Sequence, residues 1–143
     1  EESLKMIEIG EGIVRNRTHV AMDGMGVFAF TMSKVPKCIK NLLENFCIDV
    51  DEVDYLLLHQ ANQYIDEKIR KKMRFSKDKT PYCLEKFGNT SSGTIPMTMV
   101  TKISEQLRGG KNKLVMSGFG AGLSWAAVYV ETEFIEVLPL IEI

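Results

Sequence analysis

A histidine and an asparagine, each placed just after an apolar segment, are the residues of this chain best suited to chemistry. His59 ends the apolar run Leu56–Leu58. Asn89 lies 30 residues later (89 − 59 = 30), in the polar loop Gly88–Gly93. Apolar runs of this kind indicate buried strands, and ligands of open α/β sheets bind just beyond the carboxyl ends of such strands. An imidazole and a carboxamide that donate hydrogen bonds into one cavity can stabilise a developing oxyanion.

A glycine-rich loop, Gly118–Gly122, follows a third apolar segment and adds backbone N–H groups that no side chain shields. Three strand-end loops of this composition predict one shared site. Each signal has a structural alternative, because a strand-end histidine can simply be a packed residue and a glycine loop can simply be a tight turn. No metal site is expected, since the chain has only two histidines and no third ligand at a recognisable spacing. His19 lies in an apolar strand pattern and is interpreted as structural.

The bulk composition is that of an ordinary soluble domain. The chain has 143 residues, of which 45% are hydrophobic and 26% charged, and its net charge is −1. This charge gives no argument for binding nucleic acid, and no apolar run approaches the roughly 20 residues of a membrane span. The three cysteines form no C-x-x-C pair, which argues against a disulfide scaffold or a zinc site. Free thiols fit the cytoplasm, where we expect the protein to reside.

The elements that must position these residues alternate along the chain. Strands are predicted at Thr18–Met22, Val53–His59, Thr80–Leu84, Lys113–Ser117 and Ser124–Glu131. Helices are predicted at Gly26–Phe46, Ala61–Met73 and Ser92–Leu107. Pro36 predicts a kink or a break in the first helix. Residues 1–16 read as a linker and residues 132–143 as an edge strand or a tail.

Alternation of strands and helices predicts an α/β domain with a mixed, mostly parallel, five-stranded sheet and helices on both faces. The last strand follows its neighbour through a short glycine loop, which suits an antiparallel edge. The helix predicted at 61–73 also has a basic face, made of Lys68, Arg70, Lys71, Lys72 and Arg74. That face is either a solvated surface or a docking surface for an acidic partner.

Together these motifs resemble one enzyme family. The tetrad His59–Asn62, the loop Gly88–Ser92 with Pro96 beyond it, and the segment Phe119–Gly122 before Trp125 closely resemble the C-terminal half of β-ketoacyl-acyl-carrier-protein synthase III. The resemblance runs from about residue 18 to residue 131, and three motifs in the right order make it specific. It implies a thiolase-like fold, of which residues 17–143 are the C-terminal domain and residues 1–16 a remnant of the preceding half.

The resemblance also implies an activity. Members condense an acyl-CoA with malonyl-acyl-carrier protein and release carbon dioxide, without a further cofactor, at the start of fatty-acid synthesis. The positions of His59 and Asn89 stabilise the oxyanion that forms on decarboxylation. Asn62 matches a residue near the pantetheine arm and Phe119 one that lines the acyl pocket. Gly120 and Ala121 belong to the substrate-binding loop, where the backbone N–H at Ala121 serves a second oxyanion hole.

The chain departs from the family pattern at three points. No cysteine lies in the nucleophile motif, which belongs to the N-terminal half, so the chain alone is expected to be inactive in condensation. Tyr64 stands where the family usually has an arginine linked to carrier-protein binding, and Ala121 stands for a commoner glycine. The expected partners are therefore acyl-carrier protein, acyl-CoA, the chain's own N-terminal half and a second copy in a homodimer.

Two other readings remain open from the sequence. Relatives with the same histidine and asparagine make polyketides, quinolones or long-chain ketones, and this half does not distinguish them. A reading from another class is a non-catalytic domain that binds acyl carriers or only dimerises. The joint presence of His59 and Asn89 argues against the second reading.

The near-apolar start of the Ser92–Leu107 helix predicts that the isolated chain self-associates, because soluble monomers rarely expose a large apolar patch. We expect a two-fold contact that imitates the missing half. Size-exclusion chromatography with light scattering measures this directly, and a clean monomer at high protein concentration would contradict it.

Overall fold

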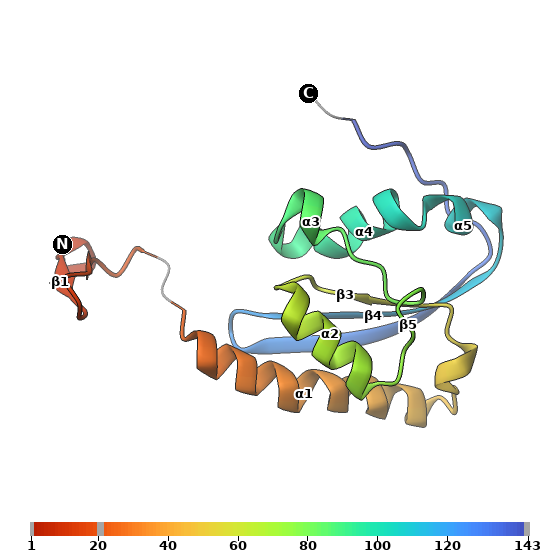
Figure 1. The fold of residues 1–143 in the computed structure, drawn as a ribbon, viewed down its shortest axis with the longest axis horizontal. Helices are drawn as coiled ribbons and strands as arrows, with labels where there is room; N and C mark the ends of the chain where they lie inside the picture. The colour runs from red at the N-terminus through yellow and green to blue at the C-terminus, as the bar shows by residue number, and fades with distance from the viewer. Residues whose placement is uncertain (1, 20–21, 142–143) are drawn as a thin grey trace.

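Two helical layers enclose a three-stranded sheet in the computed structural model, which describes residues 2–19 and 22–141 (Figure 1). The sheet has the order β3-β4-β5. These strands are β3 (Tyr55–Leu58), β4 (Asn112–Gly120) and β5 (Ser124–Thr132). Strands β3 and β4 pair in parallel, and β5 pairs antiparallel with β4.

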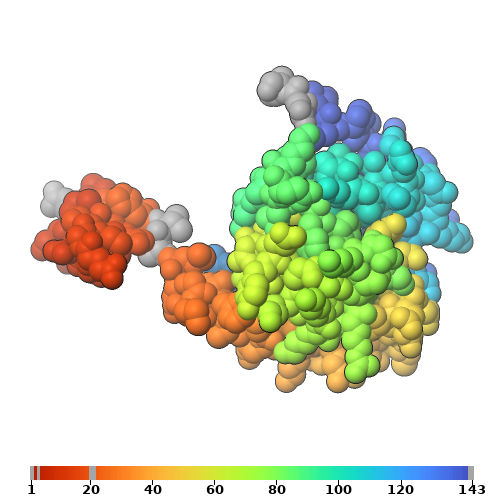
Figure 2. Space-filling model, in the orientation of Figure 1, coloured from red at the N-terminus to blue at the C-terminus, as the bar shows by residue number. Residues whose placement is uncertain are grey.

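The helices lie on both faces of the sheet, as predicted (Figure 1). One face is covered by α1 (Gly24–Asn45) and α2 (Gln63–Lys72). The other is covered by α4 (Thr94–Lys102) and α5 (Ser104–Gly109). The shorter elements are η1 (Glu2–Leu4), β1 (Ile7–Glu8), β2 (Val14–Arg15), η2 (Val50–Glu52), α3 (Leu84–Phe87) and η3 (Ser91–Gly93). The helices α3, α4 and α5 form one continuous flank in Figure 2.

Alternation of side chains along β3 builds two separate hydrophobic cores. Leu56 and Leu58 point to the core formed with α1 and α2, whereas Leu57 points to the core formed with α4 and α5. All three side chains are almost fully buried. A strand buried on both faces reads as a continuous apolar run, which is how this segment appears in the sequence. The strand therefore holds both helical layers at once.

Pro36 does not break α1, contrary to one of the two expectations for it. The helix runs continuously from Gly24 to Asn45 with Pro36 buried inside it. Because proline has no N–H, the carbonyl of Met32, four residues earlier, loses its helical partner. Lys72 at the end of α2 donates its Nζ to Met32 O at 2.9 Å. The partner that proline removes is thus replaced from the neighbouring helix.

The prediction of one five-stranded, mostly parallel sheet is wrong for the described residues, in which β1 and β2 form a separate pair and the main sheet has three strands. Within Thr18–Met22, residues 20–21 lie outside the described part, and the remaining residues form a turn, a bend and irregular structure. Within the predicted strand Thr80–Leu84, residues 80–83 are irregular and Leu84 begins α3. Pro81 there has no N–H to donate, and the N–H of Cys83 donates to a side chain, Gln60 Oε1, at 3.0 Å. With one parallel and one antiparallel pair, the sheet is evenly mixed.

The predicted Ser92–Leu107 helix is divided into η3, α4 and α5. The division between α4 and α5 falls at Ile103, whose φ of −132° is not helical. Ile103 and Leu107 are nevertheless buried in the second core. The last residues form a tail, not an edge strand: Ile135 N donates to Leu107 O at 3.1 Å, and Val137 packs into the second core. The boundary between residues 1–16 and 17–143 stays a prediction.

Asp66 is a buried acid on the inner side of α2. It is fully buried, and neither carboxyl oxygen has a hydrogen-bond partner among the described residues. Burial raises the pKa of Asp66 to about 8, and the nearby Glu67 acts in the same direction. The folded chain therefore holds a neutral carboxylic acid here at neutral pH, because an unpaired buried carboxylate is far more costly.

We expect this acid to make the folded chain less stable as pH rises. Between the ordinary pKa of an aspartate near 4 and the folded value of about 8, only the folded state binds the proton. The contribution therefore falls by about 1.4 kcal/mol for each pH unit in that window. Urea unfolding of the chain and of Asp66→Asn from pH 5 to 9 measures it: the stability of the variant relative to the original should rise with pH. A pH-independent difference would contradict the assignment.

Candidate functional site

His59 lies one residue beyond β3, where the parallel pairing with β4 still holds its backbone. Its N–H donates to Ser117 O at 2.8 Å. Its Nδ1 lies 2.9 Å from Thr94 Oγ1, at the start of α4. The ring meets Phe119 of β4 edge to face, with centroids 5.2 Å apart and planes at 82°. Contacts with β4 and α4 therefore define the position of this half-buried imidazole.

The Gly88–Gly93 loop connects Asn89 with His59 through backbone atoms of Ser91. Asn89 Oδ1 accepts from Ser91 N at 2.9 Å, and Thr94 Oγ1 donates to Ser91 O at 3.0 Å. Asn89 itself is exposed. Because its oxygen is engaged in the loop, its NH₂ group is the part left to donate to a ligand. The structure thus links the histidine and the asparagine through Thr94 and Ser91, and their convergence on one ligand stays a prediction.

The protonation state of the His59 ring follows from its surroundings. Burial lowers the pKa of the imidazole, and a hydrogen bond to the Ser91 backbone acts in the opposite direction. The neutral ring is favoured at pH 7, and a neutral imidazole has one N–H donor and one acceptor nitrogen. With Nδ1 engaged by Thr94, Nε2 is the atom left to meet a ligand.

The other predicted binding residues occupy less specific positions. Asn62 is the N-cap of α2, where its Oδ1 accepts from Ile65 N at 2.9 Å, so only its amide nitrogens remain for a ligand. Phe119 is 8% exposed and packs against His59. Gly120 ends β4 opposite Ser124, and Ala121 begins the following turn, where its carbonyl accepts from Ser124 Oγ at 2.9 Å. Phe119 is the one of these four that contacts His59 directly.

A buried polar cluster centred on Gln60 supports the site, although no sequence motif indicates it. Gln60 Nε2 donates to Thr98 Oγ1 at 2.7 Å and to Pro81 O at 3.3 Å. Its Oε1 accepts from Cys83 N at 3.0 Å. Gln60 thereby ties the end of β3 to α4 and to the segment before α3. An amide directly after a buried strand was the available signal, but its partners are 21 to 38 residues away.

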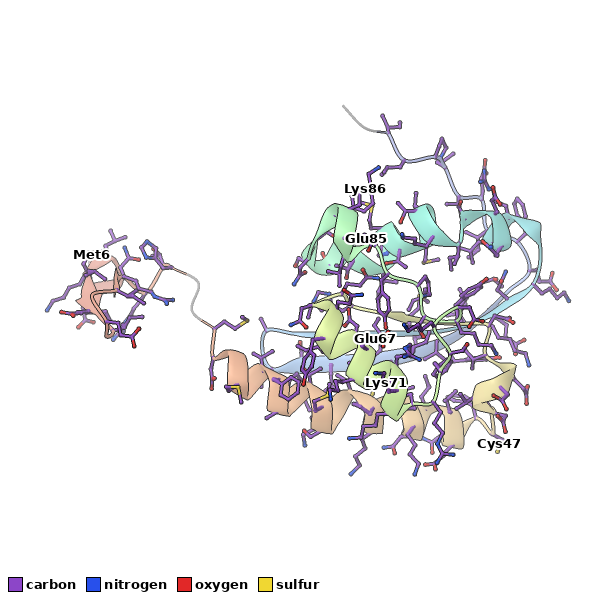
Figure 3. The ribbon with its side chains drawn as sticks, in the orientation of Figure 1. Met6, Cys47, Glu67, Lys71, Glu85 and Lys86 are labelled. Carbon is purple, nitrogen blue, oxygen red and sulfur yellow. The ribbon has the colours of Figure 1, made fainter. Side chains whose placement is uncertain are left out.

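The basic face of α2 is smaller than predicted. Arg70 is 8% exposed, is paired with Glu67 at 2.8 Å, and donates to Phe75 O. Lys72 is engaged with α1, as described above. Lys68, Lys71 and Arg74 remain exposed to solvent, and Figure 3 shows Lys71 beside Glu67 on α2.

A charged cleft of about 290 Å³ lies at the opposite end of the sheet from His59. Its lining charges pair with one another: Lys113 with Glu52 at 2.7 Å, and Lys111 with Glu133 at 3.0 Å. The cleft therefore presents satisfied ion pairs. Across residues 2–19 and 22–141, no cluster of three or more metal-binding side chains occurs. Within the same residues, no helix is long and apolar enough to cross a bilayer.

Comparison with known proteins shows which family this chain is similar to. The model of the 3-oxoacyl-[acyl-carrier-protein (ACP)] synthase III C-terminal domain matches residues 43–132. The β-ketoacyl-[acyl-carrier-protein] synthase III of Streptococcus gordonii is 40% identical over 114 residues, which are 78% of this chain and 35% of that protein. The chain thus spans about a third of the length of the curated relatives it matches.

Solved structures agree with the sequence comparison. A 3-oxoacyl-(acyl-carrier protein) synthase from Burkholderia xenovorans has a TM-score of 0.79 at 32% identity, and the match covers 82% of this chain and 34% of that one. A priming β-ketosynthase from the R1128 polyketide pathway has a TM-score of 0.70 at 26% identity, with 80% and 34% covered. The prediction of a thiolase-like half is therefore confirmed.

We expect Gln60→Leu to destabilise the chain by about 2–4 kcal/mol, because it leaves the buried N–H of Cys83 without an acceptor and removes the donor to Thr98 Oγ1 and Pro81 O. Urea unfolding measures the loss. Gln63→Leu, an exposed glutamine in the first turn of α2, is the matched control and should cost little. Equal effects of the two substitutions would show that the cluster contributes nothing specific.

Proposed function

Because this chain belongs to the 3-oxoacyl-[acyl-carrier-protein] synthase III family, we propose that it is the C-terminal catalytic half of such an enzyme. The proposed reaction is the condensation of an acyl-CoA with malonyl-acyl-carrier protein, with loss of carbon dioxide, which begins fatty-acid synthesis. The observation that best supports it is the hydrogen-bonded connection of His59 and Asn89 through Ser91 and Thr94.

In the proposed decarboxylation, the bond to the leaving carboxylate breaks and its electron pair moves toward the thioester carbonyl. Negative charge therefore develops on the thioester oxygen. The NH₂ group of Asn89 is left available to donate to it. Nε2 of His59 donates in the tautomer in which the Thr94 hydroxyl turns its proton from Ser91 O to Nδ1. Preorganised donors of this kind contribute about 3–4 kcal/mol each, because they require no reorganisation as the charge forms.

The remaining roles belong to the same proposal. Phe119 lines the acyl pocket, Gly120 and Ala121 form the loop whose backbone N–H serves the acyl-thioester carbonyl, and Asn62 contacts the pantetheine arm. The nucleophilic cysteine comes from an N-terminal half, and the enzyme works as a homodimer without a further cofactor.

Carrier-protein docking is proposed at the exposed part of the α2 basic face. Lys68, Lys71 and Arg74 supply positive charge there, whereas Arg70 is committed to Glu67. Charges on such a rim steer an acidic partner and raise its association rate.

A second candidate is the priming step of polyketide synthesis. The likeness to the R1128 priming ketosynthase supports it. It uses the same His59 and Asn89 chemistry and differs in the acyl pocket, so acyl-chain preference of the assembled enzyme separates the two candidates.

We expect His59→Ala and Asn89→Ala each to lower kcat for malonyl-thioester decarboxylation about 100-fold or more, because each removes a donor to the developing oxyanion. The assay uses the chain assembled with its N-terminal half, and carbon dioxide release is the readout. His19→Ala, at the exposed second histidine, is the control and should retain full activity. Decarboxylation at the unmodified rate in both site variants would refute the catalytic assignment.

A further inference from the structure

Thr94 lies between His59 and the Gly88–Gly93 loop, and the proposed mechanism assigns it no direct role. It is 1% exposed and is the first residue of α4. Its hydroxyl oxygen lies 2.9 Å from His59 Nδ1 and 3.0 Å from Ser91 O. A single hydroxyl thus contacts both the imidazole and the residue that holds Asn89 Oδ1.

We propose that Thr94 is a positioning residue that holds the His59 ring in one orientation and one tautomer, so that Nε2 faces the substrate. The proposal rests on the assignment of His59 as an oxyanion donor. Thr94 itself does not touch the reacting atoms in this mechanism and acts through the imidazole.

Proton counting explains why one hydroxyl has this effect. Thr94 Oγ1 has one proton and two acceptors within reach, Ser91 O and His59 Nδ1. With that proton on Ser91 O, Nδ1–H donates to Thr94 and Nε2 is an acceptor; with the proton turned to Nδ1, Nε2–H is the donor that the proposed mechanism requires. The ring also contacts Phe119 edge to face, which does not distinguish the two nitrogens by hydrogen bonding, and it hydrogen-bonds the Ser91 backbone. Thr94 contacts both Nδ1 and Ser91 O, so of the side chains that contact the ring it is the one that can select the tautomer.

Other threonines of α4 show what a purely structural role looks like. Thr98 and Thr101 each donate to the carbonyl four residues earlier, at 2.8 and 2.7 Å. Thr101 is half-buried, and within the described part of the chain its hydroxyl bonds only to its own helix. Thr94 instead donates to the carbonyl three residues earlier and also meets His59, which lies 35 residues away in the chain.

The test is NMR of the 143-residue chain labelled with ¹⁵N in its histidine rings. Only two histidines are present, and the exposed His19 is an internal reference. We expect His59 to show a single tautomer in the original chain and in Thr94→Ser, which keeps the hydroxyl. Thr94→Val and Thr94→Ala should give a mixture of tautomers and a changed His59 pKa. Thr101→Val, the matched loss of a hydroxyl on the same helix, should leave the His59 signals unchanged.

Unchanged His59 tautomer and pKa in a folded Thr94→Val or Thr94→Ala chain would overturn the proposal. So would an equal change in Thr101→Val, which would indicate a general effect of loosening α4. Thr94→Ala adds no bulk, so it remains informative if Thr94→Val does not fold.

Activity separates this proposal from the function on which it rests. In the chain assembled with its N-terminal half, Thr94→Val should lower kcat for decarboxylation about tenfold at unchanged KM, and Thr94→Ser should restore it. If His59→Ala has no effect on decarboxylation, the proposed function fails. If His59→Ala is inactive but Thr94→Val is fully active, the positioning role alone fails.

Discussion

The parallel pairing of β3 with β4 is the constraint on which the rest of this structure depends. It continues one residue past β3, where His59 N donates to Ser117 O. Because parallel strands end at the same edge of a sheet, the pairing brings His59 within ring contact of Phe119. The same strand separates the two cores, since Leu56 and Leu58 face one and Leu57 the other. Site geometry and core packing are therefore consequences of one register.

Polar groups in buried places show how the fold accommodates the site. Gln60 satisfies Cys83 N, Pro81 O and Thr98 Oγ1 together, which joins three segments behind His59. Asp66 has no such partner and stays neutral through its raised pKa. A fully bonded amide cluster rigidifies its surroundings, whereas an unpaired acid lowers stability wherever pH favours its charge. The chain thus combines a well-supported histidine with one costly buried acid in the first turn of the next helix.

Local sequence predicted the elements that depend on local interactions. The long amphipathic pattern predicted α1, the apolar run predicted β3, and the glycine loop predicted the antiparallel pair β4 and β5. The strand predicted at 80–84 is absent, because a short β-prone segment forms a strand only where a neighbouring strand pairs with its backbone. Here the side chain of Gln60 accepts the hydrogen bond of Cys83 N instead. Periodicity likewise cannot show that α4 and α5 separate at Ile103, since the apolar pattern continues across the break.

The sequence by itself determined that polar and glycine-rich motifs follow apolar segments, because residue type and hydrophobic periodicity are local properties. His59 and the glycine loop do lie at strand ends and the order of the motifs indicated the family, whereas Asn89 follows α3 and not a strand. Only the tertiary structure decided which atoms of these residues remain free: Thr94 engages Nδ1 of His59, and Ser91 engages Oδ1 of Asn89. It also removed Arg70 from the basic face by pairing it with Glu67. These outcomes depend on hydrogen bonds whose partners, direction and burial exist only once the chain has folded.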